Sequence, residues 1–356
     1  MPAFDNRQTP NVVLGSTMHS NRLKMIDNIL LINKLNVRQR RIWLVKKAGE
    51  NAVSSSEFMP FIPNDVNLEF LKQVFLSDKV TKKLENISSG TSNSQKRITP
   101  LDMLDYLLEK PEDVQEQVKI GTLFAHLDTL ITVNQRKVDL LKRKKAGYLQ
   151  KLFPKNGQNN PELRFKGYTD AWEKRKLNEI AKFNPKSTLP DVFEYVDLES
   201  VVGTKMINHR TETKTNAPSR AQRVAKFGDV FYQTVRPYQK NNYLFKINGV
   251  KYVFSTGYAQ LRPKYSSEFL LARIQENMFV RKVLDRSTGT SYPAINSNDL
   301  AKIEITIPNS AEQENIGMLF LTLDNLIAVN QRTTIPIFPN QNSTLSLRFH
   351  PPSALN

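Results

Sequence analysis

Basic, amide, aromatic and hydroxyl side chains gather in three stretches of the C-terminal half of the sequence. Residues 203–226 are rich in Lys and Arg and hold one acid, Glu212; residues 236–242 interleave charge, amide and aromatic groups; and residues 287–292 are rich in hydroxyls. Such groups bond phosphates and base edges, so the three stretches together predict DNA contact, whereas each alone is equally typical of a solvated surface loop. The candidate DNA-binding residues are Lys205, Arg210, Arg220, Arg223, Arg236, Tyr238, Lys240, Asn241, Asn242, Ser287, Thr288, Thr290, Ser291 and Tyr292.

Residues with the types and spacing of an enzyme site are missing. The chain has no cysteine, which excludes a disulfide, a thiolate zinc site and a cysteine nucleophile. Its four histidines lie far apart in the sequence, and no GxGxxG or GxxxxGK[ST] loop occurs. Asp191 and Glu194 faintly resemble a nuclease carboxylate set but lack the acid-x-Lys partner at useful spacing. We therefore expect no catalytic and no metal site.

The charge balance points to a polyanionic partner. The 356 residues include 51 Lys and Arg against 34 Asp and Glu, a formal net charge of +17. Such an excess favours nucleic acid, although a merely basic protein has the same composition. With 39% hydrophobic and 24% charged residues the chain can bury a core. No apolar run approaches membrane-spanning length and no signal layout opens the sequence, so we expect a cytoplasmic protein without a membrane partner.

A long internal repeat organises the chain. Residues 116–136 and 312–332 share the pattern EQxxIGxLFxxLDxLIxVNQR at an offset of 196, and weaker matches extend upstream. This period is too long for a solenoid and predicts two homologous domains, each followed by the same helix. The first copy has only about 27 residues ahead of its matching part, so it is expected to lack its opening segment, and the second helix is expected to be cut short after Arg332.

The repeated helix carries an apolar heptad seam. Steps of four and three residues run through both copies, which predicts two helices paired as an antiparallel coiled coil, with ordinary core packing as the alternative. A polar seam residue fixes helix register or simply ends the stripe, and both interpretations stay open for Asn134 and Asn330. The seam residues are Ile120, Phe124, Leu127, Ile131, Asn134, Val138, Leu141, Ile316, Phe320, Leu323, Ile327 and Asn330. The basic residues of 136–155 face DNA phosphates, an acidic partner or solvent.

Short alternating segments between 172 and 310 predict an α+β domain. Residues 229–233, 243–247 and 303–307 have strand patterns, Asn248-Gly249 is typical of a hairpin turn, and Ser266 to Arg281 predicts one amphipathic helix. The expected order is an incomplete first domain, a helix, a linker, a complete second domain, a shortened helix and an irregular tail. The boundaries are 1–110, 111–155, 156–171, 172–310, 311–332 and 333–356.

These features resemble the specificity (S) subunit of type I restriction–modification systems. The resemblance rests on the duplicated motif, the helix running into LLKRKKAGYLQKLF, and the segment PELRFKGYTDAWEKRKL at 161–177. It is supported by Gly228-Asp229-Val230 with Arg236-Pro237, and by Gly289-Thr290-Ser291 before Pro308, and it covers about residues 28–332.

The resemblance implies an α+β fold with two target recognition domains, the first incomplete here, alternating with long helices that pair as an antiparallel coiled coil. It implies sequence-specific recognition of double-stranded DNA, in which each domain reads half of a bipartite site. It also implies docking of methyltransferase (M) and nuclease (R) subunits, and no active site on this chain. S-adenosylmethionine, ATP and Mg²⁺ are expected on those partner subunits, and no cofactor on this chain. The rivals are a non-specific basic coiled-coil adaptor, an inactive S-subunit fragment and, third, an endonuclease acting alone.

Overall fold

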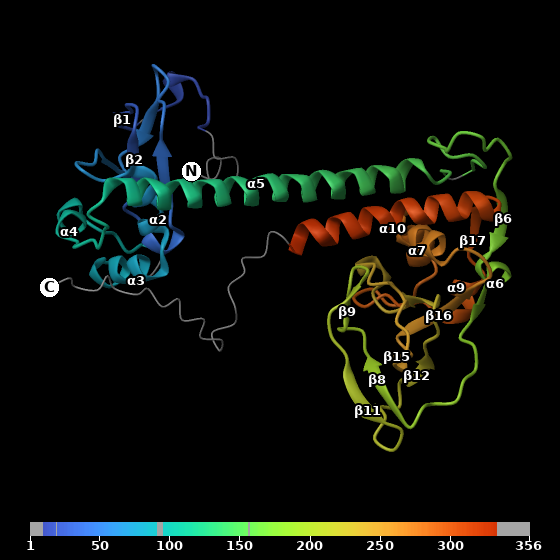
Figure 1. Cartoon of the computed structure of the whole chain (residues 1–356). Helices are drawn as coiled ribbons and strands as arrows, with labels where there is room; N and C mark the ends of the chain where they lie inside the picture. The colour runs from blue at the N-terminus through green and yellow to red at the C-terminus, as the bar shows by residue number, and fades with distance from the viewer. Residues whose placement is uncertain (1–9, 19, 91–94, 156, 333–356) are drawn as a thin grey trace. The chain divides into compact units, whose positions relative to one another are not determined.

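The computed structural model describes residues 10–18, 20–90, 95–155 and 157–332 (Figure 1). The chain divides into unit 1, Met1–Val133, and unit 2, Asn134–Asn356. The predicted irregular tail at 333–356 lies outside the described residues, as do Thr91 and Ser92 of the weaker repeat match. The predicted mixture of helices and strands is confirmed, whereas the six domain boundaries stay a prediction.

Unit 1 contains a small antiparallel sheet with strand order β3-β2-β5 and a separate two-stranded sheet formed by β1 and β4. All five residues of β2 are buried, and its side chains enter two apolar clusters, one with α2, α3 and α4 and the other with β3 and β5. The elements are η1 (Gly15–Thr17), β1 (Arg22–Lys24), β2 (Ile29–Asn33), η2 (Val37–Gln39), β3 (Ile42–Val45), β4 (Val53–Ser55), β5 (Phe58–Phe61), α2 (Leu68–Leu76), α3 (Asp78–Ile87), α4 (Pro100–Leu104) and α5 (Val114–Lys151), of which α5 continues into unit 2.

Unit 2 has two four-stranded sheets, ordered β14-β13-β16-β7 and β11-β8-β15-β12, with β8 and β15 parallel. Two shorter pairs, β10-β9 and β17-β6, complete its strands within the described residues. The strands are β6 (Glu173–Lys176), β7 (Ala181–Phe183), β8 (Val192–Val196), β9 (Val201–Val202), β10 (Lys205–Met206), β11 (Arg210–Thr213), β12 (Ala221–Val224), β13 (Val230–Gln233), β14 (Tyr243–Leu244), β15 (Tyr252–Ser255), β16 (Tyr258–Pro263) and β17 (Glu304–Ile307). The helices are α6 (Leu177–Ile180), η3 (Pro237–Gln239), α7 (Ser267–Gln275), α8 (Asn277–Leu284), α9 (Ser297–Ala301) and α10 (Ser310–Arg332).

The same element order recurs in both units. A buried strand, a 3₁₀ turn, a paired strand, two short helices and a long helix follow one another as β2, η2, β5, α2, α3 and α5 in unit 1, and as β13, η3, β16, α7, α8 and α10 in unit 2. Both 3₁₀ turns are flanked by residues with left-handed backbone, Asn36 and Arg40 in one unit and Arg236 and Lys240 in the other. The repeat in the sequence is therefore also a repeat in the structure.

The motif residues Gln and Gly have matching roles in the two copies. Gln117 and Gln313 each donate from Nε2 to the carbonyl of a proline ahead of their helix, at 2.7 and 2.9 Å. Gly121 and Gly317 lie where a Cβ would come within 2.9 Å of the start of α2 or α7. The long helix in each unit thus crosses the N-terminus of the preceding short helix at close range.

The two copies differ at the edge of the sheet. In unit 2, β7 pairs with the outer side of β16. In the described part of unit 1, β5 pairs only with β2, and no four-stranded sheet like β11-β8-β15-β12 occurs.

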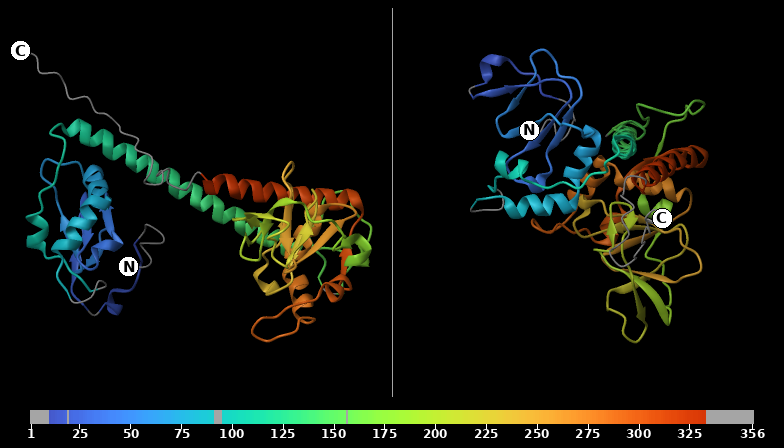
Figure 2. Two further views of the ribbon diagram at one scale, coloured as in Figure 1. Left: turned by 90° about the horizontal axis from the view of Figure 1, so that it is seen from below. Right: turned by 60° about the vertical axis from the view of Figure 1, so that its left-hand side comes forward.

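The largest core cluster lies in unit 2, where α10 and the C-terminal part of α5 run side by side in opposite directions (Figures 1 and 2). Phe153 stacks on Phe320 with ring centroids 6.0 Å apart, and Trp172 meets Phe153 edge-on. Nζ of Lys145 lies 2.5 Å from a carboxylate oxygen of Asp324 on α10.

Two details of the predicted elements are wrong. The helix predicted from Ser266 to Arg281 is two helices, because Glu276 has an extended backbone and forms a buried ion pair with Arg273. Asn248-Gly249 does not close a hairpin, since β14 pairs with β13 whereas β15 belongs to the other sheet. Gly249 has a φ of +84°, so the turn is real, but it connects the two sheets of unit 2.

Candidate nucleic-acid interface

Hydrogen bonds from buried amide side chains brace the loop between β13 and β14. Nε2 of Gln233 donates to the carbonyl of Val235 at 2.6 Å and to Oε1 of Gln239 at 2.9 Å, and the backbone N–H of Gln233 donates to Oδ1 of Asn242 at 2.9 Å. Gln233 and Asn242 are 2% and 1% exposed. These hydrogen bonds from buried amides brace the backbone of the loop, so the loop is presented in a defined shape.

Two of the predicted stretches meet at Arg236. The backbone N–H of Arg236 donates to the carbonyl of Pro293, and its guanidinium lies 5.1 Å from the ring centre of Tyr292. Isolated bridges join Ala294 to Val235 and to Thr288. The 236–242 and 287–292 stretches, far apart in sequence, therefore form one composite surface.

The composite surface presents groups suited to nucleic acid. Tyr238 and Tyr292 are exposed, as are Thr290 and Ser291. An aromatic ring, a guanidinium and hydroxyls can stack on bases and bond phosphates or base edges. We name this group, Arg236, Tyr238, Thr290, Ser291 and Tyr292, the Arg236 surface.

Several predicted contact residues bond inside the protein instead. Nζ of Lys240 donates to Asn277 at 2.5 Å, and burial lowers the pKa of Lys240. Oδ1 of Asn241 accepts from the backbone N–H of Gly203 at 2.8 Å, and Asn242 is part of the buried brace. Ser287 donates to the carbonyl of Val283, and the backbone of Thr288 exchanges two hydrogen bonds with Ala294. Their contact with DNA stays a prediction, and these bonds give each of the five a structural role.

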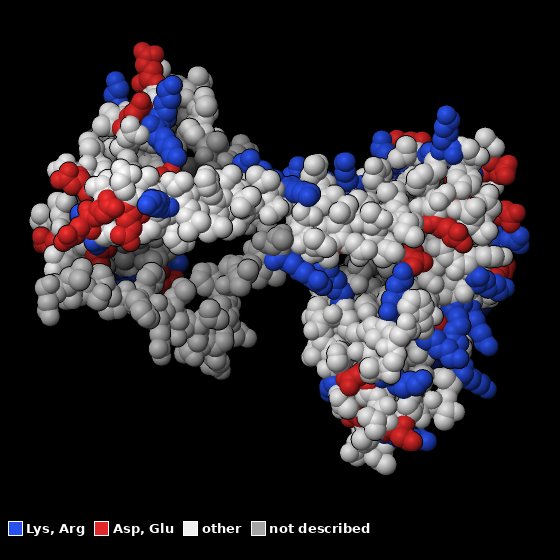
Figure 3. All heavy atoms as spheres, viewed as in Figure 1, with Lys and Arg blue, Asp and Glu red and all other residues white. Residues whose placement is uncertain are grey.

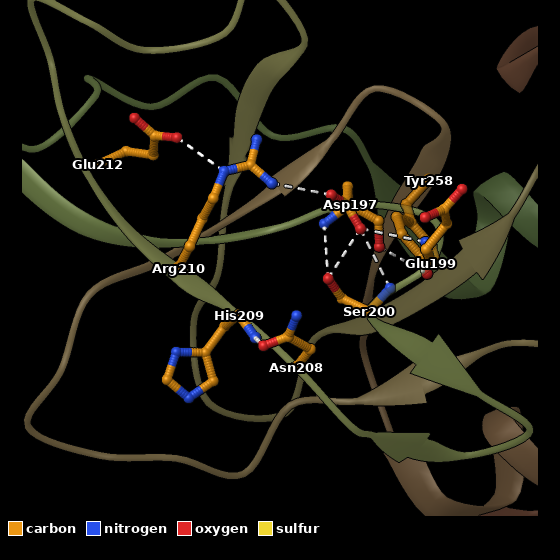
Figure 4. A network of polar contacts seen from close by, with 8 residues as sticks. All are labelled: Asp197, Glu199, Ser200, Asn208, His209, Arg210, Glu212 and Tyr258. Atoms are coloured by element: carbon orange, nitrogen blue, oxygen red, sulfur yellow. Dashed lines mark hydrogen bonds and ion pairs between the residues drawn. The ribbon is translucent and has the colours of Figure 1, made fainter.

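Arg210 on β11 is neutralised by two carboxylates, as Figure 4 shows. Its guanidinium bonds Glu212 at 2.8 Å and Asp197 at 3.0 Å, and it lies 4.7 Å from the ring centre of Tyr195. Burial acts to raise the pKa of Asp197, but hydrogen bonds from Ser200 and Arg210 hold that pKa below its ordinary value. A cation with two carboxylate partners attracts phosphate weakly.

The other candidate cations of the 203–226 stretch differ in their exposure and in their bonding partners. Lys205 donates to Oε1 of Gln331 on α10 at 2.8 Å. Arg223 is half-buried, burial lowers its pKa, and its Nε has no partner among the described atoms. Arg220 is exposed, and no ion pair of its side chain occurs within the described ranges. Among the four candidate cations of this stretch, Arg220 therefore has most freedom to meet an anion.

Sequence reasoning missed a group of cations near the edge strand β7. Lys182 on β7 is exposed and lies opposite Arg262 on β16, and Lys264 follows in the chain with its backbone bonded to Ile180. In Figure 3, Lys and Arg side chains gather on the side of unit 2 that carries α6. The missing signal was strand pairing, because these cations are scattered in sequence.

The predicted seam is buried in one copy and largely exposed in the other. Ile316, Phe320, Leu323, Ile327 and Asn330 of α10 are buried, as is Val138 of α5, and Leu141 packs against the same core. Ile120 and Asn134 are half-buried, whereas Phe124, Leu127 and Ile131 are exposed. The expectation that Leu127 and Ile131 are buried in a helix contact is wrong for this chain.

In the part of the chain that the structure describes, no helix is long and apolar enough to cross a membrane. Nor do three or more His, Asp or Glu side chains gather there in a group that could hold a metal ion.

Comparisons with known proteins identify the class. Residues 169–337 match the family described as "Type I restriction modification DNA specificity domain". The chain is 24% identical over 169 residues to the type I restriction enzyme HindI specificity subunit of Haemophilus influenzae, covering 45% of this chain and 36% of that protein. It is 22% identical over 241 residues to the MjaVIII specificity subunit of Methanocaldococcus jannaschii, covering 62% and 56%.

A solved structure has a similar fold. The type I restriction–modification S subunit from M. genitalium superimposes with a TM-score of 0.58 at 14% identity, over 87% of this chain and 79% of that one.

Residues 169–337 thus match the type I DNA specificity domain model, and the chain is similar to specificity subunits of type I restriction enzymes. This confirms the resemblance inferred from the duplicated motif. The chain spans about a third to just over half the length of the two curated relatives it matches.

Proposed function

We propose that this chain is a DNA-recognition subunit of a type I restriction–modification complex and is itself non-catalytic. The observation that carries the proposal is the family match over 169–337, the part of the chain that also holds the Arg236 surface. The excess of cations supports a nucleic-acid partner.

The Arg236 surface and Arg220 are the proposed points of contact with DNA. The guanidinium of Arg236, on a braced loop, lies over the ring of Tyr292. A rigid loop reads base edges better than a flexible one because less conformational entropy is lost on binding. Arg220 supplies a cation without a carboxylate partner among the described residues. It suits phosphate contact, which positions a protein on DNA without reading sequence.

The finer architecture is part of the proposal. Residues 1–110 and 172–310 correspond to two target recognition domains, of which the first is incomplete, and the repeated helices pair as an antiparallel coiled coil. Partner M and R subunits would carry the chemistry, and S-adenosylmethionine, ATP and Mg²⁺ would bind there. The shared element order and the packing of α10 on the end of α5 support this arrangement.

A selection from a randomised duplex pool tests sequence recognition. The chain, purified alone and with a co-expressed M subunit, is incubated with the pool, and bound DNA is sequenced over several rounds. We expect a defined set of base pairs to be enriched. The enriched duplex and a scrambled one are then titrated with wild type and variants at two salt concentrations.

Three variants assign the contacts. Arg236→Ala should weaken binding to the enriched duplex by about 1–3 kcal/mol and binding to the scrambled one far less, if Arg236 reads a base. Arg220→Ala should weaken both duplexes alike and reduce the salt slope by about one ion. Arg210→Ala is the matched control, because two carboxylates already neutralise this cation. Tight binding without any enriched sequence would favour the non-specific basic adaptor, and no binding even with M would favour an inactive fragment.

A further inference from the structure

A cavity of about 110 Å³ in unit 2 is lined by four cations and one acid. It lies between the strand pair β6-β17, the helices α7 and α8, and the residues that follow α5. Its volume is enough for several waters, at roughly 30 Å³ each, and therefore for one phosphate-sized group. We call it the Arg273 cavity. The cations are Lys155, Lys174, Arg273 and Lys282, and the acid is Glu304.

Arg273 is held at this cavity with one edge of its guanidinium unused. The side chain is 4% exposed, Nη1 bonds Glu276, and the guanidinium lies 5.2 Å from the ring centre of Phe153. Nε has no hydrogen-bond partner among the described atoms, and Nη2 has none among the described residues. A buried donor without an acceptor is unfavourable, so an acceptor from outside this chain is expected beside that edge.

Two other arginines of unit 2 show what this edge binds. Arg164 donates from Nε and Nη2 to the carboxylate of Glu312, at 2.8 Å in both bonds. Arg262 donates from the same two nitrogens to Asp229, again at 2.8 Å. Nε and Nη2 form the flat edge that takes two oxygens of one oxyanion. Among the described residues, no carboxylate occupies this edge of Arg273, so an oxyanion from elsewhere suits it.

The other copy of the repeat has no charge at this place. The helices α2 and α7 each have nine residues, so Arg273 corresponds to Val74. The extended residue that follows is Glu276 in unit 2 and Ser77 in unit 1. Ser77 caps α3 through its side chain, whereas Glu276 makes no such bond to α8. Because a buried ion pair is seldom more stable than apolar packing, its presence at a cavity indicates a role in binding.

Lys282 and Lys174 supply positive charge from two further elements. Lys282 on α8 is half-buried, and its Nζ donates to the carbonyl of Glu304 at 3.1 Å. Burial and, next, the charge of Arg273 lower the pKa of Lys282, because the two cations are partly removed from water near each other. Lys174 on β6 is exposed and has no ion pair within the described ranges. An anion in the cavity would relieve the repulsion between Lys282 and Arg273.

We propose that the Arg273 cavity binds a phosphate group, with Arg273, Lys282 and Lys174 as its ligands. A tetrahedral anion with more than one charge suits three cations from α7, α8 and β6, whereas a single carboxylate would leave some of them unused. Lys155 is not counted among the ligands because it is paired with Glu162 at 3.3 Å. The phosphate is inorganic or belongs to a DNA backbone. The DNA source rests on the proposed function, and the inorganic source does not.

Line broadening of the ³¹P resonance of inorganic phosphate tests binding to the full chain, at constant ionic strength in sodium chloride. We expect broadening whose dependence on phosphate concentration fits one site. Lys282→Gln should weaken binding at least about tenfold, because a charge-assisted hydrogen bond is lost. Lys302→Gln is the matched control, since Lys302 is an exposed lysine just ahead of β17 that does not line the cavity, and binding should be unchanged.

A second variant uses the residues of the other repeat. The double substitution Arg273→Val with Glu276→Ser gives unit 2 the pair that unit 1 has, so it should keep the fold and lose phosphate binding. Circular dichroism confirms that each variant is folded. Lys282→Gln leaves the buried ion pair in place, so it tests the cavity even where the double variant does not fold.

Duplex DNA distinguishes the two sources of phosphate. If the DNA backbone supplies the phosphate, saturating duplex should remove the broadening of inorganic phosphate, and Lys282→Gln should reduce the salt slope of DNA binding by about one ion. If the ligand is inorganic phosphate, the broadening and the salt slope should both stay unchanged.

Absence of broadening with the wild-type chain would overturn the proposal, as would equal broadening with wild type and Lys282→Gln. The phosphate titration contains no DNA, so its failure refutes the cavity alone. A chain that binds phosphate but no duplex, even with a co-expressed M subunit, refutes the proposed function and leaves the cavity supported.

Discussion

Gly317 is a position where adding one methyl group should destabilise the protein although it improves helix propensity. A Cβ at Gly317 would lie 2.7 Å from Oγ of Ser266 and 2.9 Å from both Cβ of Glu268 and the backbone N of Phe269. Oγ of Ser266 also accepts the hydrogen bond that caps α7, at 3.2 Å. The added methyl group would therefore clash both with the backbone of α7 and with the Ser266 hydroxyl that caps this helix.

The magnitude follows from three opposing effects. Alanine in place of glycine in a helix gains about 1 kcal/mol. Overpacking costs about 1–3 kcal/mol, and a damaged N-cap costs about 1 kcal/mol. Gly317→Ala should thus lower the free energy of unfolding by about 1–3 kcal/mol. Gly147→Ala on α5 should raise it by about 0.5–1 kcal/mol, because no atom lies within 4 Å of its added Cβ.

Urea unfolding in a Trp43→Phe background measures the free energy of unfolding of Gly317→Ala and of Gly147→Ala. The sequence has two tryptophans, so Trp172, which is buried in unit 2, becomes the single fluorescent reporter. The two variants should shift the midpoint in opposite directions at constant m-value. If Gly317→Ala were as stable as Gly147→Ala, the close crossing of α10 over α7 would be refuted, and with it the explanation of the glycine in the repeated motif.

Three further outcomes are expected. Asp229→Ala should lower the free energy of unfolding by about 3–5 kcal/mol in thermal melts, because the buried carboxylate bonds Arg262 twice at 2.8 Å; a change below 1 kcal/mol would contradict this. Leu323→Asp should unfold unit 2 whereas Leu127→Asp should cost less than about 1 kcal/mol, as judged by circular dichroism; equal effects would contradict the exposure difference. Hydrogen bonds from His209 and Thr211 hold the pKa of Glu194 below its ordinary 4.5. Its stabilisation is therefore present above pH 4.5 and lost as pH falls through the lower folded pKa, and Glu194→Gln should remove that part of the acid dependence.

The repeat and its long helices could be predicted from the sequence because they are carried by local patterns. A heptad seam and a duplicated motif need no knowledge of distant contacts. The helix break at Glu276 could not be predicted, since the segment keeps its amphipathic pattern while a buried ion pair with Arg273 fixes the extended residue. The turn at Gly249 was visible, but which strands it connects depends on sheet pairing.

The candidate site, too, could be predicted only in part from the sequence. Residue type marked Arg236 and Tyr292 as separate candidates, but the backbone pairing of their two loops at Pro293 and Ala294 brings them together. Asn241 and Asn242 had the right chemistry for base edges, yet backbone N–H groups inside unit 2 use their oxygens. An amide reads a base only where the fold leaves it unsatisfied, and the sequence does not contain that information.

The repeated motif separates what the local sequence determines from what depends on neighbouring segments. The motif specifies an apolar face, a glycine for close crossing and acids at fixed places, and both copies keep all three. Whether that face is buried depends on a second segment, which α10 obtains from residues 137–172. Exposed apolar residues on a helix that is otherwise built like a covered one indicate a missing contact rather than a solvated surface. Among the described residues, no segment covers Phe124, Leu127 and Ile131 as residues 137–172 cover their counterparts on α10.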